Sequence, residues 1–205
     1  MSLKKILTIL IIISPFFWWQ IINKSNIFIK QYQQIPSFVK NKISSVFTNT
    51  SKIDEFRWND VTRDNRPIFG KIFYNKSQFL VIEFINYLNN LNPRFYFQSG
   101  SGQSDSPPQT EPIAILLLPC SILGIFRLIK KSQFKILLIG LLSCFFGFIT
   151  GQISFYFLFP TAIFYLYASA YEISFWSKKN QKIFFSILFA YTIFLFFRVI
   201  FLSHL

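Results

Sequence analysis

Residues 89–119 read NNLNPRFYFQSGSGQSDSPPQTEPIAILLLP, and this stretch decides the fold that the sequence predicts. Its three consecutive aromatic residues, Phe95 to Phe97, predict a short strand-like clamp. A run of Gly, Ser, Asp and Pro follows, and these residues form turns through their backbone preferences and local side-chain hydrogen bonds. The run leads directly into an apolar segment. The sequence therefore predicts a polar loop held at the mouth of a membrane helix, where a head group or sugar can be recognised.

Long apolar runs favour a membrane protein over a small soluble domain. The chain has 205 residues, of which 52% are hydrophobic and 20% aromatic. We expect an all-α integral membrane protein with about five transmembrane helices, because the apolar runs have the length and hydropathy of spans. The predicted regions are a signal anchor at 1–22, an extracytoplasmic segment with amphipathic helices at 23–111, and four spans within 112–205. Those four spans are expected at 113–129, 134–150, 153–174 and 183–202.

The first apolar run resembles a signal peptide but lacks a suitable cleavage site. Two lysines precede it, and it ends in bulky residues that include Trp18 and Trp19. Tryptophan pairs suit the membrane interface, whereas signal cleavage needs small residues. We therefore expect an uncleaved anchor that spans the membrane.

Short basic loops predict the topology. Cationic residues occupy the connections after the second and fourth predicted spans, whereas the turn at 151–152 has no charge. The positive-inside rule then places the N-terminus inside, and the long segment and the C-terminus outside, in a multi-pass plasma membrane protein. Lys24 and Lys30 oppose this orientation, but long loops are less constrained by the rule. The cations that fix the assignment are Arg127, Lys130, Lys131, Lys135, Lys178, Lys179 and Lys182.

Two amphipathic helices are expected in the extracytoplasmic segment. One has an apolar face around Val39, and the other runs from about Phe79 to Leu91, with Ser77 as a cap and Asn92-Pro93 as its end. Both fit a helix that lies on the bilayer or packs against protein. The first helix also presents Ile43, Val46 and Phe47. Pro119 and Pro160 are expected inside spans, where each can kink the helix.

Short motifs in the same region resemble a known family. They are Asn86-Tyr87-Leu88, Leu91, Pro93, Phe95 to Phe97, Gly100 and the proline-containing entry to the next helix. Together they resemble the distal extracytoplasmic loop of bacterial GT-C glycosyltransferases, the group related to aminoarabinose and mannosyl transferases. The likeness covers residues 54–175 and includes Thr62-Arg63-Asp64, Asn75-Lys76 and the run from Phe134 to Ala170.

Two departures from that family shape the expected function. The family often continues with Gly-Asp and nearby Arg and His, whereas Ser101 follows Gly100 and this loop has no His. The catalytic acid of the family lies in an N-terminal helical module, and we expect that this chain lacks that module. The resemblance therefore implies ancestry and ligand binding more than catalysis by this chain alone.

The expected substrate-binding residues combine arginines with loop residues. Arginine guanidinium groups bind phosphate in two-point geometry, which suits the phosphate of a polyprenyl-linked sugar. The same arginines, with Arg57 and Arg66, can instead form an exposed salt-bridge cluster that only folds the loop, and such mixed exposed charges are the more ordinary case. Their acidic partners would be Asp54, Asp60 and Asp64. No catalytic residue is assigned, although a single base at Asp64 or Asp105 stays open. The substrate-binding candidates are Arg63, Asp64, Arg94, Tyr96, Gly100 and Asp105.

Other reactive residues predict structural roles. Cys120 and Cys144 lack metal-ligand spacing, and we expect neither a metal site nor a cofactor. Glu172 is expected to pair with Lys178 or Lys179. Arg198 lies near the outer end of the last span, where it either snorkels or binds a lipid phosphate. The net charge of +13 is split between membrane flanks and a loop, which disfavours nucleic-acid binding.

These observations support two hypotheses. In the first, the chain is a reduced or split GT-C-like protein that binds a lipid-linked sugar or supports a membrane partner carrying the catalytic module. In the second, it is a structural envelope protein whose outer segment docks another protein without sugar chemistry. A transporter is disfavoured because the spans lack paired buried charges and matched broken repeats.

Overall fold

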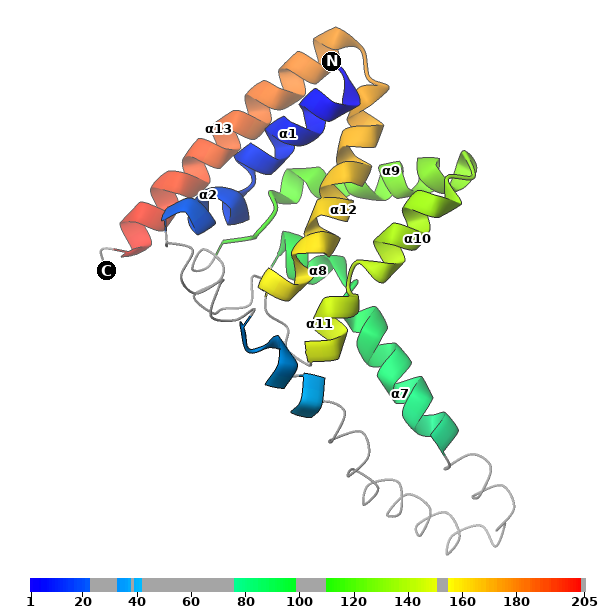
Figure 1. Ribbon diagram of the computed structural model, residues 1–205. Coiled ribbons are helices and arrows are strands. Elements are labelled where there is room, and N and C mark those ends of the chain that lie inside the picture. Colours follow the sequence, from blue (N-terminus) through cyan, green and yellow to red (C-terminus); the bar gives the residue numbers. More distant parts are fainter. Residues whose placement is uncertain (23–32, 38, 42–75, 99–109, 151–154, 204–205) are drawn as a thin grey trace, which may run out of the picture.

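A computed structural model describes residues 1–22, 33–37, 39–41, 76–98, 110–150 and 155–203 (Figure 1). Helices account for 83% of these described residues, and none of them forms a strand. The predicted all-α class is therefore confirmed. The predicted helix around Val39 lies mostly outside the described residues, as do the candidates Arg63, Asp64, Gly100 and Asp105.

The N-terminal apolar run forms two helices, α1 (Leu3–Ile13) and α2 (Pro15–Ile22). Ser14 between them has an extended backbone, with φ −64° and ψ 132°, and its hydroxyl donates to the Leu10 carbonyl at 2.6 Å. Proline disfavours a helical conformation in the residue before it, so Pro15 explains the break. The expectation of one continuous helix is wrong at this point.

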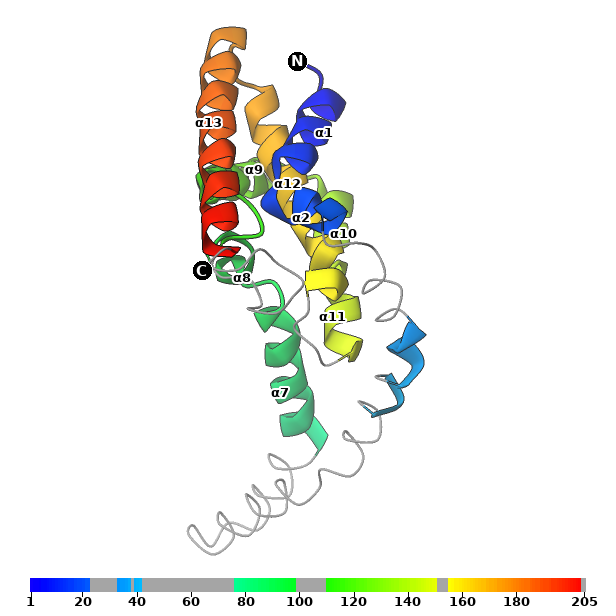
Figure 2. The same ribbon diagram turned by 90° about the vertical axis from the view of Figure 1, so that its left-hand side faces the viewer.

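Helix α12 (Phe155–Ser174) lies at the centre of the structure, and α9 (Leu118–Lys130) runs across it (Figures 1 and 2). Gly124 on α9 allows this close approach, because a Cβ there would lie 2.0 Å from the Ala168 carbonyl oxygen. Helix α1 packs against the same central helix. The core therefore forms where three segments distant in sequence meet at α12.

The two prolines of the predicted spans differ in position. Pro160 lies inside α12, as the sequence predicts. Pro119 lies in the first turn of α9, after the 3₁₀ helix η1 (Ile115–Leu117). A proline there removes no hydrogen bond, because first-turn N–H groups have no partner within the helix. Pro119 therefore lies at the start of α9, whereas the sequence predicted it in the interior of a helix.

The predicted span at 134–150 is also interrupted. It forms α10 (Phe134–Leu142) and α11 (Phe145–Thr150). At the break, the Ser143 hydroxyl lies 2.6 Å from the Gly140 carbonyl and 2.9 Å from the Thr161 hydroxyl of α12. Side-chain bonds of serine to backbone carbonyls compete with helical hydrogen bonding, which accounts for the interruption.

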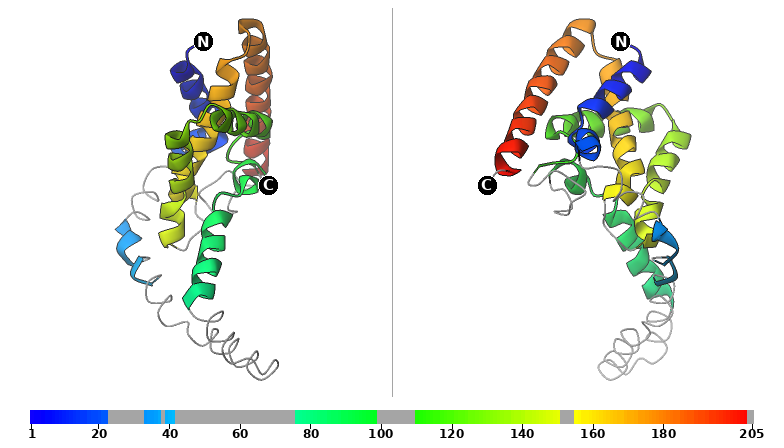
Figure 3. Two further views of the ribbon diagram at one scale, coloured as in Figure 1. Left: turned by 90° about the vertical axis from the view of Figure 1, so that its right-hand side faces the viewer. Right: turned by 60° about the vertical axis from the view of Figure 1, so that its left-hand side comes forward.

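Helices α7 (Lys76–Asn89) and α8 (Pro93–Phe97) come directly before the polar run. Helix α7 projects from the other helices, and α8 follows it (Figures 1 and 3). The strand-like clamp predicted for Phe95 to Phe97 is therefore wrong, since these residues are helical. Ser77 lies inside α7 rather than at its cap.

The last helix, α13 (Lys178–Ser203), is the longest described. Its stretch Lys178–Val199, with 22 residues, is the one helix among the described residues that is long and apolar enough to cross a membrane. The N-terminal ammonium group donates to the Gln181 side-chain oxygen at 3.0 Å, so the chain begins beside the start of α13 (Figure 2).

Candidate functional site

The candidate site is built on helix α8, whose sequence favours a helix that begins at Pro93. The Asn92 side chain accepts a hydrogen bond from the Arg94 backbone N–H at 3.0 Å, and Pro93 occupies the first turn. An Asn cap satisfies a backbone donor that the helix leaves unpaired, and proline is favoured at the position after it. The aromatic residues that follow are thereby held on a short helix.

Tyr96 and Phe97 anchor that helix in the protein interior. Both side chains are fully buried, and their rings lie 5.1 Å and 5.6 Å from the Tyr165 ring of α12. The Tyr96 hydroxyl donates to the Asn90 carbonyl at 2.7 Å, while the Tyr165 hydroxyl donates to the Leu91 carbonyl. These contacts fix α8 against the central helix.

Burial also keeps Tyr96 uncharged. Desolvation raises the pKa of its hydroxyl well above the ordinary value of 10.0, and a hydrogen bond with Thr161 opposes that rise only in part. The hydroxyl therefore stays protonated even at pH 10.0, where an exposed tyrosine is half ionised, and it acts as a hydrogen-bond donor.

The chain after the polar run returns to the same place. The Ile113 backbone N–H donates to the Tyr96 carbonyl at 2.9 Å, and the Phe16 N–H of α2 donates to the Pro112 carbonyl at 3.1 Å. Glu111 is buried and accepts a hydrogen bond from the Tyr191 hydroxyl of α13. Residues 96–97 and 110–113, which we call the loop base, are thus joined to α2, α12 and α13.

Two of the predicted binding residues, Arg94 and Tyr96, lie beside or within the loop base and differ in their exposure. Arg94 is exposed beside the loop base, so its guanidinium group is accessible. Tyr96 lies in the interior, where its position fits an anchor for the binding segment. Helix α8 carries both Arg94 and Tyr96, and the other candidates lie outside the described residues. Arg198 is exposed on α13 and lies close enough to Tyr191 to act on it electrostatically.

A second polar cluster lies between α9 and α12. The hydroxyl oxygens of Ser121 and Ser169 are 2.6 Å apart and fully buried. Arg127 pairs with Glu172 through two contacts, Nε to Oε2 at 2.8 Å and Nη2 to Oε1 at 3.0 Å. The prediction that Glu172 pairs with Lys178 or Lys179 is wrong, because the crossing of α9 brings Arg127 to the carboxylate.

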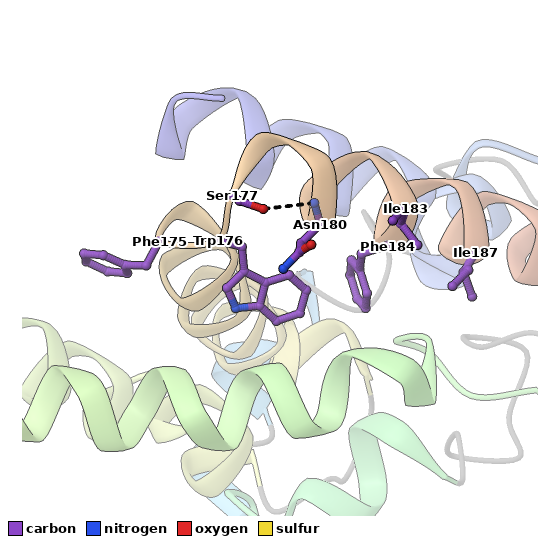
Figure 4. Close-up of a pocket in the computed structure, with 7 residues that line it drawn as sticks. All are labelled: Phe175, Trp176, Ser177, Asn180, Ile183, Phe184 and Ile187. Atoms are coloured by element: carbon purple, nitrogen blue, oxygen red, sulfur yellow. Dashed lines mark hydrogen bonds between the residues drawn. The ribbon is translucent and has the colours of Figure 1, made fainter.

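An open groove lies where α12 ends and α13 begins (Figure 4). Its volume is about 550 Å³. No motif in the sequence predicts this groove, although an aromatic pair lies next to lysines at 175–179. The lining residues are Phe175, Trp176, Ser177, Asn180, Ile183, Phe184 and Ile187.

No site for a metal is evident among the described residues, where no three His, Cys, Asp or Glu side chains gather. Cys120 and Cys144 are both buried as free thiols. Comparisons of the chain with protein-family models, curated proteins and solved structures find no match. The resemblance to GT-C glycosyltransferases therefore stays a prediction from short motifs.

Proposed function

We propose that this chain is an integral membrane protein that holds its polar loop at the outer membrane surface and binds a polyprenyl-phosphate sugar there. The observation that carries the proposal is the hydrogen bond from Ile113 to Tyr96. It closes the loop at its base, and the buried aromatic residues beside it fix that base to the helices. Residues held at or beside such a base can contact a ligand with little loss of conformational entropy.

Exposed apolar side chains support the membrane location. Large hydrophobic residues are exposed on α9, α10 and α13. In the apolar stretch of α13 that is long enough to cross a membrane, only 17% is buried. A soluble protein rarely exposes so large an apolar surface, whereas lipid covers it at no penalty. Examples are Ile122, Phe126, Phe134, Ile139, Ile183, Phe189, Phe194 and Phe197.

The polar contacts between helices agree with this environment. The Ser121–Ser169 contact and the close approach at Gly124 are typical of membrane helices, which pack through small residues and hydroxyl groups. We propose five crossings, by α1 with α2, η1 with α9, α10 with α11, α12, and α13.

Contacts between the helix ends support the proposed orientation. The N-terminus lies beside Gln181, and the Lys131 ammonium group lies 4.4 Å from the Phe175 ring. The basic ends of α1, α9 and α13 thus meet the end of α12, as the positive-inside rule requires for one cytoplasmic surface. The loop base then belongs to the outer surface.

Arg94 is the proposed phosphate ligand. Its guanidinium group is exposed, and its backbone is fixed by the Asn92 cap and the buried Tyr96. Guanidinium groups form strong charge-assisted hydrogen bonds with phosphate. In this proposal, the chain binds the lipid-linked sugar and a membrane partner carries out the transfer.

The test is binding of a polyprenyl-phosphate sugar to the full chain in lipid nanodiscs. We expect Arg94→Ala to weaken binding by at least about tenfold, since hydrogen bonds to charged groups contribute about 1.5–3 kcal/mol. Arg94→Lys should keep part of the affinity, and Lys135→Ala should keep all of it. Equal affinity for the original chain and Arg94→Ala would refute this role.

A second candidate function is docking of another envelope protein. Helix α7 favours it, because its apolar face is exposed and consists of Val81, Phe84, Ile85 and Leu88. A photo-crosslinking residue at position 84 should then capture a protein in cells, while one at Asn86, on another face of α7, should not. Capture of lipid alone at position 84 would contradict docking.

A further inference from the structure

The rings of Trp176 and Phe184 form an aromatic wall of the groove between α12 and α13 (Figure 4). The rings of Trp176 and Phe184 meet edge to face at 5.3 Å, and the Trp176 indole N–H donates to the Glu172 carboxylate at 3.3 Å. Ile183 and Ile187 are 52% and 54% exposed along the same side of α13. The groove therefore offers a preformed apolar surface that is open to its surroundings.

Positive charge gathers at one end of the groove, around Phe175 to Ser177. The Lys131 ammonium group lies over Phe175, and Lys178 and Lys179 directly follow Ser177. All three lysines are exposed. The N-terminal ammonium group also lies here, bound to the Gln181 side chain. Within the described parts of α9, α12 and α13, Glu172 is the one acidic residue, and Arg127 already pairs with it.

The combination of charge and shape selects one class of ligand. An apolar groove takes an acyl chain, and surrounding lysines favour an anionic phosphate over a zwitterionic head group. The α13 part of the groove runs from Asn180 to Ile187, which is about 10 Å of helix. That length accommodates part of an acyl chain but is short for a protein interface.

We infer that this groove binds an anionic phospholipid, with one acyl chain against Trp176 and Phe184 and the phosphate among Lys131, Lys178 and Lys179. The inference rests on the membrane location proposed above but not on sugar binding. The site lies at the basic end of the helices, remote in the proposed topology from Arg94 and the loop base.

The test uses native mass spectrometry of the full chain purified in detergent. The protein receives equal amounts of phosphatidylglycerol and phosphatidylcholine with identical acyl chains. We expect the chain to retain phosphatidylglycerol at least fivefold more often. The triple variant Lys131→Gln, Lys178→Gln, Lys179→Gln should lose this preference. The matched triple Lys30→Gln, Lys40→Gln, Lys76→Gln, in the proposed outer segment, should keep it.

A second variant tests the groove itself. Asn180→Trp places a ring in the groove and should reduce phosphatidylglycerol retention several-fold, whereas Ser186→Trp adds the same ring elsewhere on α13. Equal retention of both lipids, equal loss in both lysine triples, or no effect of Asn180→Trp would overturn the inference. Displacement of the lipid by equimolar inorganic phosphate would also overturn it, because the acyl chain would then contribute nothing.

The outcome is separable from that of the proposed function. Arg94→Ala should leave lipid retention unchanged, because Arg94 lies beside the loop base and remote from the groove. Loss of lipid preference in a chain that still binds the polyprenyl-phosphate sugar would remove only the groove inference. A chain that fractionates as a soluble protein would remove both proposals.

Discussion

The backbone N–H of Ile113 donates to the carbonyl of Tyr96 at 2.9 Å and thereby joins the two ends of the polar loop. Both residues are fully buried, so water does not compete for this hydrogen bond. The strength of such a buried hydrogen bond depends on how well the two residues that form it are packed. The packing and hydrogen bonds of Tyr96 should therefore control the stability of the loop base.

Tyr96→Phe should destabilise the protein by about 1–2 kcal/mol. It keeps the ring against Tyr165 but removes the hydroxyl that donates to the buried Asn90 carbonyl. A buried acceptor left without its donor accounts for a loss of this size. Thermal unfolding in detergent, followed by size-exclusion chromatography, measures the change. Tyr167→Phe is the control on α12, and an equal loss in both variants would contradict the specific role of the Tyr96 hydroxyl.

Two glycine variants should differ in stability. Gly124→Ala places a Cβ 2.0 Å from the Ala168 carbonyl oxygen, so a backbone must move and α9 must separate from α12. Gly140→Ala meets the Phe164 ring at 2.3 Å, and a side chain can rotate away. We expect Gly124→Ala to lower the unfolding temperature more, with a penalty of about 1–3 kcal/mol from overpacking. A larger loss for Gly140→Ala would show that the helix crossing tolerates expansion.

The all-α class could be predicted from the sequence because long apolar runs exclude most other fold classes. The ends of the helices could not, because they depend on local and tertiary contacts. The strand-like reading of Phe95 to Phe97 rested on aromatic β-propensity, which is weak and context-dependent. The Asn92-Pro93 start and the burial of Tyr96 against Tyr165 outweigh it. The interruption at Ser143 likewise needs Thr161, a residue of another helix, as its partner.

The candidate site was predicted only in part for the same reason. Arg94 could be identified because an exposed arginine next to a turn-rich loop is a local pattern. The partner of Glu172 could not, since Arg127 is 45 positions away and meets it only through the crossing of α9 over α12. The groove depends on how α13 leaves α12, which no periodicity in the sequence encodes.

The stability of the protein should fall at alkaline pH in part because Tyr96 is buried. The pKa of its hydroxyl is raised above 10.0 in the folded protein, so unfolded chains lose this proton first as pH rises. The associated stability is fully present below pH 10.0 and declines above it, as linkage requires. Unfolding temperatures measured from pH 8 to pH 11.5 should therefore fall less steeply in Tyr96→Phe than in the original chain. Parallel curves would show that Tyr96 ionises equally in both states.

Arg127→Ala should destabilise the protein more than Glu172→Gln. Glu172 has a side chain that is only 6% exposed, whereas Arg127 is 36% exposed. Removing the arginine leaves a buried carboxylate without its counter-charge, which is more unfavourable than losing the attraction itself. Glutamine at 172 removes the charge but still accepts a hydrogen bond from the Trp176 indole.

The partial exposure of Arg127 lowers the expected loss to about 2 kcal/mol, below the 3–5 kcal/mol typical of fully buried pairs. The interaction free energy of the two side chains is measured by unfolding Arg127→Ala, Glu172→Gln and the double variant in the same detergent. Lys130→Ala is an exposed control on α9. The double variant should be more stable than Arg127→Ala alone, because no uncompensated charge remains. If the double variant instead lost the sum of both single effects, the two side chains would act independently and the ion pair would not hold α9 to α12.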